Sequence, residues 1–119
     1  MEISILNKNI FDSMVELDKL QSEKISIGSK HRIQKILKIL SEHYKPFNES
    51  HIEILKKYNA VEKDGRLEVE NPSIAFVEEF RYLSDQENRI LIDPIEYSKI
   101  EDIETSNIYN FDILDKFLF

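Results

Sequence analysis

The hydrophobic positions of the first 25 residues alternate at first and then recur at helical spacing. Residues 2–6 alternate, with Ile3 and Ile5 on one side, which predicts a short strand. Asn9 is a suitable cap for a helix that runs to about residue 23. The apolar stripe of that helix is expected to consist of Ile10, Met14, Leu17 and Gln21, with Phe11 and Leu20 beside them.

The longest periodic run lies between residues 33 and 58. Its members are Ile33, Leu37, Leu40, Tyr44, Phe47, His51, Ile54 and Tyr58. They are separated alternately by four and three residues, a spacing that keeps one helix face against a partner helix. Gly28 permits a turn before this run, and Ser29 is the expected cap.

Pro46 stands in the middle of this run, where a proline costs a helix about 3 kcal/mol. Two interpretations are open. One is a single long helix kinked at Pro46, which the unbroken periodicity favours. The other is two helices, the second beginning with a capping box of Ser50 and Glu53. Either version is expected to pack against the first helix as a helical hairpin.

The next segment carries a strong turn signal and a helix start. Asp64-Gly65 predicts a β-hairpin between Val61 and the pair Leu67 and Val69. Asn71-Pro72 predicts the beginning of a third helix. Its buried face is expected to comprise Ile74, Val77, Phe80 and Arg81, with Phe76 and Leu83 widening it.

The C-terminal quarter combines an extended segment with short helices. Residues 89–97 are expected to be extended, with Ile90, Ile92, Ile95 and Tyr97 available for burial. Pro94 restricts this strand to a sheet edge or breaks it. Ser98 and Glu101 form a possible capping box, and residues 110–118 predict a final short helix that docks the apolar tail. That helix carries Ile113, Leu114, Phe117 and Leu118. The sequence therefore predicts an α+β fold in one domain, residues 1–119: a long helical hairpin, small antiparallel β-hairpin elements and short C-terminal helices.

Composition narrows the class of protein. The 119 residues are 41% hydrophobic, which argues against a disordered chain. Cysteine is absent, which excludes disulfides, thiolate metal sites and cysteine nucleophiles. No apolar run reaches the length of a membrane span, and no secretory signal is expected. The richness in Ile, Lys and Asn over Gly, Ala and Arg fits a low-GC genome.

Charge is distributed unevenly along the chain. Residues 1–29 carry five acidic and three basic residues. Residues 30–57 carry three acidic and seven basic residues, and residues 58–119 carry fifteen acidic and six basic residues. The net charges are therefore −2, +4 and −9. The basic segment fits a nucleic-acid face less well than a solvated helix face, because arginines and aromatic platforms are few. The acidic half fits either a surface complementary to a basic groove or simple solubility.

The sequence offers no constellation of catalytic or metal-binding residues. The histidines His31, His43 and His51 lack metal-ligand spacing. Glu68 and Glu70 share one side of a predicted strand but are expected to face solvent. With two glycines in the whole chain, no glycine-rich phosphate loop can form. We therefore expect a protein that is not an enzyme and needs no cofactor.

From residue 33 onward the order of features resembles a family of small uncharacterised tailed-phage proteins, a domain of unknown function. The matching stretches are ILKKYNA (54–60), EKDGRLEVE (62–70), AFVEEFRYLSDQE (75–87), RILIDPIEYSKIE (89–101) and FDILDKFLF (111–119). The family supplies no catalytic residues to carry over. The resemblance implies a phage-encoded protein-binding protein, either an inhibitor of a host defence machine or a virion assembly component.

These two roles predict different surfaces. An inhibitor in the host cytoplasm would meet a basic partner complex through acidic residues, with adjoining aromatic side chains. The candidate partner-binding residues are Glu78, Glu79, Glu96, Glu101, Asp102, Glu104, Tyr44 and Phe47. A virion component would form a homo-oligomer through Tyr44, Phe47, Tyr58 and the 117–119 tail. Membrane association and direct nucleic-acid binding are not expected.

Overall fold

The computed structural model describes all residues from 1 to 119 and has an α+β fold. In chain order the elements are β1 (Glu2–Leu6), α1 (Asn7–Gln21), α2 (Ile27–Lys57), β2 (Val61–Lys63), β3 (Arg66–Glu68), α3 (Ile74–Ser84), β4 (Glu87–Leu91) and α4 (Phe111–Leu114). Two 3₁₀ turns follow β4 and α4, at Tyr97–Lys99 and Asp115–Phe117. None of the helices is both long and apolar enough to cross a membrane.

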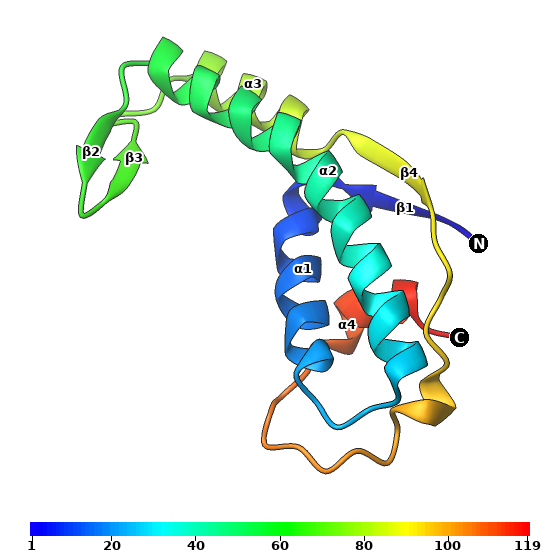
Figure 1. Ribbon diagram of the computed structural model, residues 1–119. Helices are drawn as coiled ribbons and strands as arrows, with labels where there is room; N and C mark the ends of the chain where they lie inside the picture. The colour runs from blue at the N-terminus through cyan, green and yellow to red at the C-terminus, as the bar shows by residue number, and fades with distance from the viewer.

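The molecule consists of a body and a projecting arm (Figure 1). The body contains residues 1–44 and 87–119, and the arm contains residues 45–86, with the second half of α2, the β2–β3 hairpin and α3. The radius of gyration is 16.9 Å, whereas a compact chain of this length has about 13.5 Å. The overall dimensions are 48 × 31 × 20 Å. The molecule is therefore more extended than a compact chain of the same length.

The hydrophobic core lies entirely in the body. It consists of Ile3, Ile5, Ile10, Leu17, Leu20, Ile33, Ile36, Leu40, Ile90, Ile92, Ile95, Ile100, Leu114 and Phe117. In the arm, Ile54 is the only buried apolar residue. The arm is held by a smaller and more open set of contacts, in which α3 lies along α2.

Helix α2 is continuous through Pro46, which confirms the single-helix interpretation. Pro46 is exposed, and the helix continues through it although proline has no N–H for the helical hydrogen bond at that position. The predicted cap was wrong, because the hydroxyl of Ser26 accepts the backbone N–H of Ser29 at 3.2 Å. Ser29 itself is buried in the first turn of the helix. The predicted hairpin of α1 and α2 is confirmed.

Helix α1 begins at Asn7, two residues before the predicted cap at Asn9. No side chain caps it. Instead the Asn7 backbone N–H donates to the carbonyl of Gln86 at 2.9 Å, and its side-chain amide donates to the carbonyl of Leu83 at 2.8 Å. The carbonyl of Gln86 thus accepts a hydrogen bond from a backbone N–H at the start of α1. The sequence pattern had predicted a nearby side-chain cap for this role.

The predicted buried face of α3 is correct in part: Phe76, Phe80 and Leu83 are half-buried, whereas Arg81 is exposed. Phe76 and Phe80 are half-buried against Tyr58 and His51, at ring-centroid distances of 5.4 and 4.9 Å. Ile74, predicted to be buried, is 78% exposed, and Val77 is also exposed. The larger rings bury more apolar area than the aliphatic side chains, so the helix turns them inward. The cap is Ser73 and not Asn71-Pro72, since its hydroxyl accepts the N–H of Phe76 at 3.1 Å.

Two short antiparallel sheets complete the fold. Strand β1 pairs with β4, placing Ile3 opposite Ile90, and the predicted strand at residues 2–6 is confirmed. The predicted β2–β3 hairpin is also confirmed, with Asp64 and Gly65 at positive φ values of 51° and 78°. Strand β4 ends at Leu91, ahead of Pro94, as expected for a proline that breaks a strand.

The C-terminal tail is docked on the segment that follows β4. Ile95 forms a parallel bridge with Leu118, and its N–H donates to the Phe117 carbonyl at 2.8 Å. The predicted final helix is confirmed in outline as α4 plus the following 3₁₀ turn. The capping box at Ser98 was wrong, since Ser98 lies inside the 3₁₀ turn Tyr97–Lys99. Tyr97, expected to be available for burial, is largely exposed.

A hydrogen-bonded joint connects the arm to the body. The Asn88 side-chain amide donates to the carbonyl of Ile5 at 3.1 Å and to the side-chain oxygen of Asn7 at 2.8 Å. The Asn88 side-chain oxygen lies 3.2 Å from Nδ1 of His43, which must therefore carry the proton. Asn7, the first residue of α1, bonds to Leu83 and Gln86, and these are the bonds of the joint that reach the arm. The joint therefore links β1, α1, α2, α3 and β4.

Candidate functional site

The most enclosed hollow with an apolar lining lies in the body, where the loop that connects the Tyr97–Lys99 turn to α4 forms much of its lining. We call it the loop hollow. Its volume is about 240 Å³, and it is lined by Leu20, Tyr97, Ile100, Glu101, Ile103, Thr105, Asn107, Tyr109, Phe111 and Leu114. The floor comes from the core, because Leu20, Ile100 and Leu114 are all buried. The walls come from the loop.

Glu23, at the end of α1, anchors this loop. One carboxylate oxygen of Glu23 accepts three hydrogen bonds: from the hydroxyl of Thr105 at 2.5 Å, the side-chain amide of Asn107 at 2.6 Å and the hydroxyl of Tyr109 at 2.7 Å. The Glu23 residue is only 8% exposed. The bonds from Thr105, Tyr109 and Asn107 hold the pKa of Glu23 below its ordinary value, so the carboxylate stays charged.

Tyr109 completes the anchor from the loop side. Its burial, together with its hydrogen bond to Glu23, raises the pKa of the phenol to about 12. The hydroxyl therefore stays protonated and remains a donor at neutral pH. The ammonium of Lys19 lies 5.5 Å from the Tyr109 ring centroid and donates to the Ile108 carbonyl at 3.1 Å. The wall formed by Tyr109 is thus fixed on several sides.

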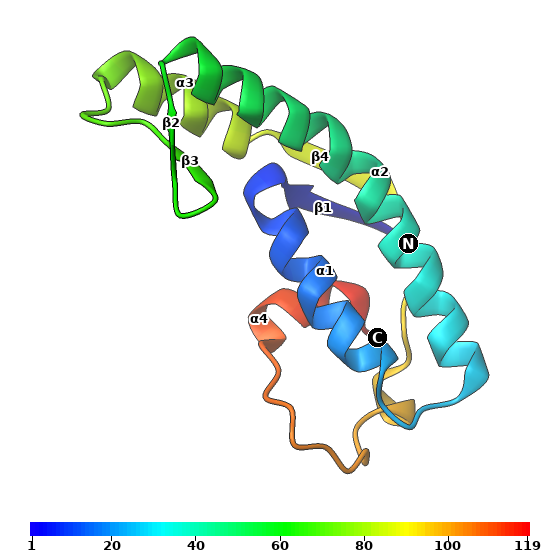
Figure 2. The ribbon, with the colours of Figure 1, turned by 60° about the vertical axis from the view of Figure 1, so that its left-hand side comes forward.

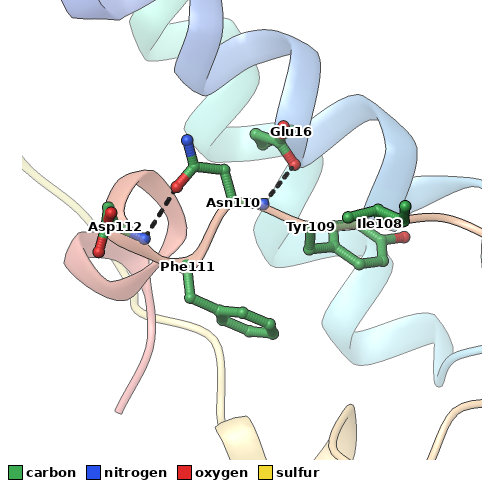
Figure 3. A pocket seen from close by; sticks show the side chains of 6 residues that line it. All are labelled: Glu16, Ile108, Tyr109, Asn110, Phe111 and Asp112. Carbon is green, nitrogen blue, oxygen red and sulfur yellow. Dashed lines mark hydrogen bonds between the residues drawn. The ribbon is translucent and has the colours of Figure 1, made fainter.

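A second, shallower depression lies beside the loop hollow and shares Tyr109 and Phe111 with it (Figure 3). Here the Glu16 carboxylate accepts the N–H of Asn110 at 3.4 Å, and the Asn110 side chain accepts the N–H of Asp112 at 3.1 Å. Figure 3 shows the Phe111 ring pointing away from Glu16. These polar groups are engaged in starting α4, so the depression is best explained as part of the scaffold.

The predicted partner-binding residues fall into separate places. Glu101, Asp102 and Glu104 lie on the exposed loop of the body, and none of them forms an ion pair or a side-chain hydrogen bond. Glu96 lies on the same segment, 3.8 Å from the ammonium of Lys99. We call the segment that these four residues define, 96–104, the acidic loop.

Glu78 and Glu79 lie on α3 in the arm, at the opposite end of the molecule (Figure 2). The Glu79 carboxylate accepts the Tyr58 hydroxyl at 2.7 Å and the Lys57 ammonium at 3.0 Å. These bonds lower the pKa of Glu79. Glu79 is therefore committed within the arm, and the structure does not join it to the acidic loop.

Tyr44 and Phe47 belong to a row of rings along α2. The ring centroids of Phe11 and Tyr44 are 5.8 Å apart, those of Tyr44 and Phe47 6.1 Å, and those of Phe47 and His51 6.1 Å. Burial lowers the pKa of His51, so this imidazole is neutral in the row. Both Tyr44 and Phe47 are half-buried. Tyr44 contacts Phe11 of α1, and the row reaches α3 only through His51, which contacts Phe80.

Sequence reasoning missed the anchor and most of the hollow. Glu23 is more than 80 residues from Thr105, Asn107 and Tyr109, and no spacing rule connects residues so far apart. The polar run at residues 105–107 gave a weak signal, since such residues commonly hydrogen-bond in loops. The three histidines lie apart, and no group of three or more histidine or carboxylate side chains is placed to hold a metal ion.

No protein-family model, curated protein or solved structure matches this chain. The resemblance to tailed-phage proteins therefore remains a prediction. Any function has to be argued from the surfaces themselves.

Proposed function

We propose that this chain is a non-enzymatic protein-binding protein, encoded by a phage, that inhibits a host nucleic-acid-binding defence machine. The acidic loop is the surface that meets the partner. In the host cytoplasm it would occupy a basic groove that otherwise holds nucleic acid.

The supporting observation is the unpaired charge of the acidic loop. Three carboxylates within four residues, Glu101, Asp102 and Glu104, stay exposed without a cation, although the chain has sixteen lysines and arginines. Exposed Tyr97 and Phe111 lie beside them, at the mouth of the loop hollow. Charge next to exposed aromatic rings is typical of a protein interface.

A charge-matched pair of variants tests this proposal. The loop variant Glu101→Gln/Asp102→Asn/Glu104→Gln removes three negative charges from the acidic loop. The hairpin variant Glu62→Gln/Asp64→Asn/Glu68→Gln removes three from the arm, where these side chains are also exposed and unpaired. Both keep side-chain shape, and neither touches the core.

Each tagged protein is expressed in a low-GC bacterial host and its bound proteins are identified. The wild type and the hairpin variant are expected to retain one nucleic-acid-binding complex that is released as salt rises, because exposed charges are screened over about 8–10 Å at moderate ionic strength. The loop variant is expected to lose it. Equal capture by the loop and hairpin variants would refute the proposal.

A virion assembly role is the second candidate, and the arm favours it. On α3, Ile74 is 78% and Tyr82 74% exposed, and nothing in the chain covers them. Apolar side chains displayed on a projecting arm suit packing between copies. Sedimentation of the wild type against an Ile74→Glu/Tyr82→Glu variant tests this role, which requires a concentration-dependent oligomer in the wild type only.

A further inference from the structure

We propose that the loop hollow receives a single arginine side chain from a basic segment of the partner protein. This inference rests on the proposed function and names the chemistry by which the acidic loop recognises its partner. It assigns a role to Phe111 and Tyr97, neither of which was among the predicted partner-binding residues.

The size of the hollow suits one side chain. Its volume of about 240 Å³ lies below the roughly 300–1,000 Å³ of sites that enclose drug-sized molecules. Its floor of Leu20, Ile100 and Leu114 is apolar and buried, so it can cover a hydrocarbon stem. Arginine and lysine both bury such stems and keep a charged head at the surface.

The rim of the hollow selects a cation. Among the lining residues, Glu101 carries the only ionisable carboxylate, and its side chain has no partner in the chain. Thr105 and Asn107 already donate to Glu23, so they are committed to the anchor. Asp102 and Glu104 add negative charge nearby on the same loop. An anionic occupant would be repelled, whereas a cation gains a charge-assisted contact.

The aromatic pair at the mouth favours arginine over lysine. Tyr97 and Phe111 are 44% and 45% exposed, with ring centroids 6.5 Å apart and planes at 81°. A guanidinium stacks on aromatic faces and loses its hydration more readily than an ammonium does. Lys19, over the ring of Tyr109, shows that this part of the loop already accommodates a cation against an aromatic side chain.

Two peptide probes of equal charge test the inference on the full chain: acetylated tetra-arginine amide and acetylated tetra-lysine amide. Titration is followed by ¹H–¹⁵N NMR. The arginine probe is expected to bind several-fold more tightly and to shift the amide signals of Ile103 and Leu114, which line the hollow. Equal affinity for the two probes, or shifts confined to the exposed acidic residues Glu101, Asp102 and Glu104, would overturn the inference.

Variants identify the groups that make the selection. Phe111→Leu keeps an apolar side chain but removes the ring, and it should abolish the preference for arginine. Tyr97→Leu supplies the same readout if Phe111→Leu does not fold. Glu101→Gln should weaken both probes. The control is Tyr82→Leu, which removes a more exposed aromatic ring from the arm, far from the hollow, and should change neither affinity. An arginine preference that survives both ring deletions would overturn the inference.

Partner capture separates this inference from the function on which it rests. If Phe111→Leu still captures the host complex while the triple loop variant loses it, the acidic loop binds the partner without the hollow, and the inference fails alone. If both variants capture the complex as the wild type does, the proposed function fails as well. Loss of capture by both variants supports the two together.

Discussion

Phe117 and Phe119 give a matched pair of substitutions two residues apart in the docked tail. The Phe117 side chain is fully buried in the core of the body, whereas Phe119 is 61% exposed. Both residues take part in the backbone hydrogen bonds that join the tail to Ile95. Replacing either by alanine leaves those backbone bonds possible, so the difference between the two variants isolates the buried ring.

The expected magnitude follows from the burial of Phe117. A buried aromatic side chain removes about 150–250 Å² from water, which at about 25 cal/mol/Å² amounts to roughly 4–6 kcal/mol as an upper limit. Measured Phe→Ala substitutions in cores cost about 3–5 kcal/mol. For a chain of 119 residues this lowers the melting temperature by roughly 12–20 °C. The Phe119→Ala variant should cost no more than about 0.5 kcal/mol.

Urea unfolding monitored by circular dichroism measures both variants. The wild type is expected to have about 6–18 kcal/mol of stability, so Phe117→Ala should remain folded in water. Its unfolding midpoint should fall while the slope of the transition stays unchanged. The assignment of Phe117 to the core would be refuted if Phe117→Ala lost as little stability as is expected for Phe119→Ala, since that would place the Phe117 ring in solvent.

Four further substitutions test the anchor, the long helix and the joint. Because hydrogen bonds to its charged form hold the pKa of Glu23 below its ordinary value of 4.5, wild-type stability should fall as the pH drops below about 4.5, and Glu23→Gln should flatten that dependence in urea unfolding. Because the pKa of Tyr109 is raised to about 12, the stabilisation it gives should be present below pH 10 and disappear between pH 10 and 12; tyrosinate absorbance should show a phenol that titrates near pH 12 and is missing from Tyr109→Phe. Pro46→Ala should raise the free energy of unfolding by up to about 3 kcal/mol, since it restores a hydrogen bond to an exposed helix position. Asn88→Ala should cost about 1–3 kcal/mol, because it leaves polar groups at the joint unpaired.

Each of these has a contradicting result. An acid dependence of stability that is unchanged in Glu23→Gln, or five tyrosines that titrate together, would mean that the anchor does not hold the loop in solution. A loss of stability in Pro46→Ala would show that the proline is needed where it stands. A neutral Asn88→Ala variant would mean that water replaces its hydrogen bonds at the joint.

The candidate site shows where sequence reasoning succeeds and where it stops. The charge count located the acidic half of the chain, and four of the predicted partner-binding residues define the acidic loop. It could not show that Glu79 is committed to Lys57 and Tyr58, because those contacts depend on α3 lying against α2. Nor could the charge count show that the acidic loop and α3 lie at opposite ends of the molecule, since the order of charges along a sequence does not give the distances between them.

The sequence by itself determined the local structure of this protein. The period of the apolar positions is a property of a single helix, and it correctly predicted that α2 continues past Pro46. The turn at Asp64-Gly65 is likewise set within four residues, because it needs only the backbone freedom of that pair. Such features depend on neighbours in the chain, so they can be predicted without a fold.

The tertiary structure decided which faces are covered and which residues meet. Strand β1 pairs with β4, which lies more than 80 residues later in the chain. Glu23 accepts hydrogen bonds from three side chains at a similar separation in sequence. A buried carboxylate is stable only where donors surround it, and those donors arrive only when the chain closes. Within the predicted face of α3, Phe76 and Phe80 are covered by rings of Tyr58 and His51, whereas Ile74 and Val77 stay exposed. Which residues of a face are covered depends on what lies opposite, and the tertiary structure decides that.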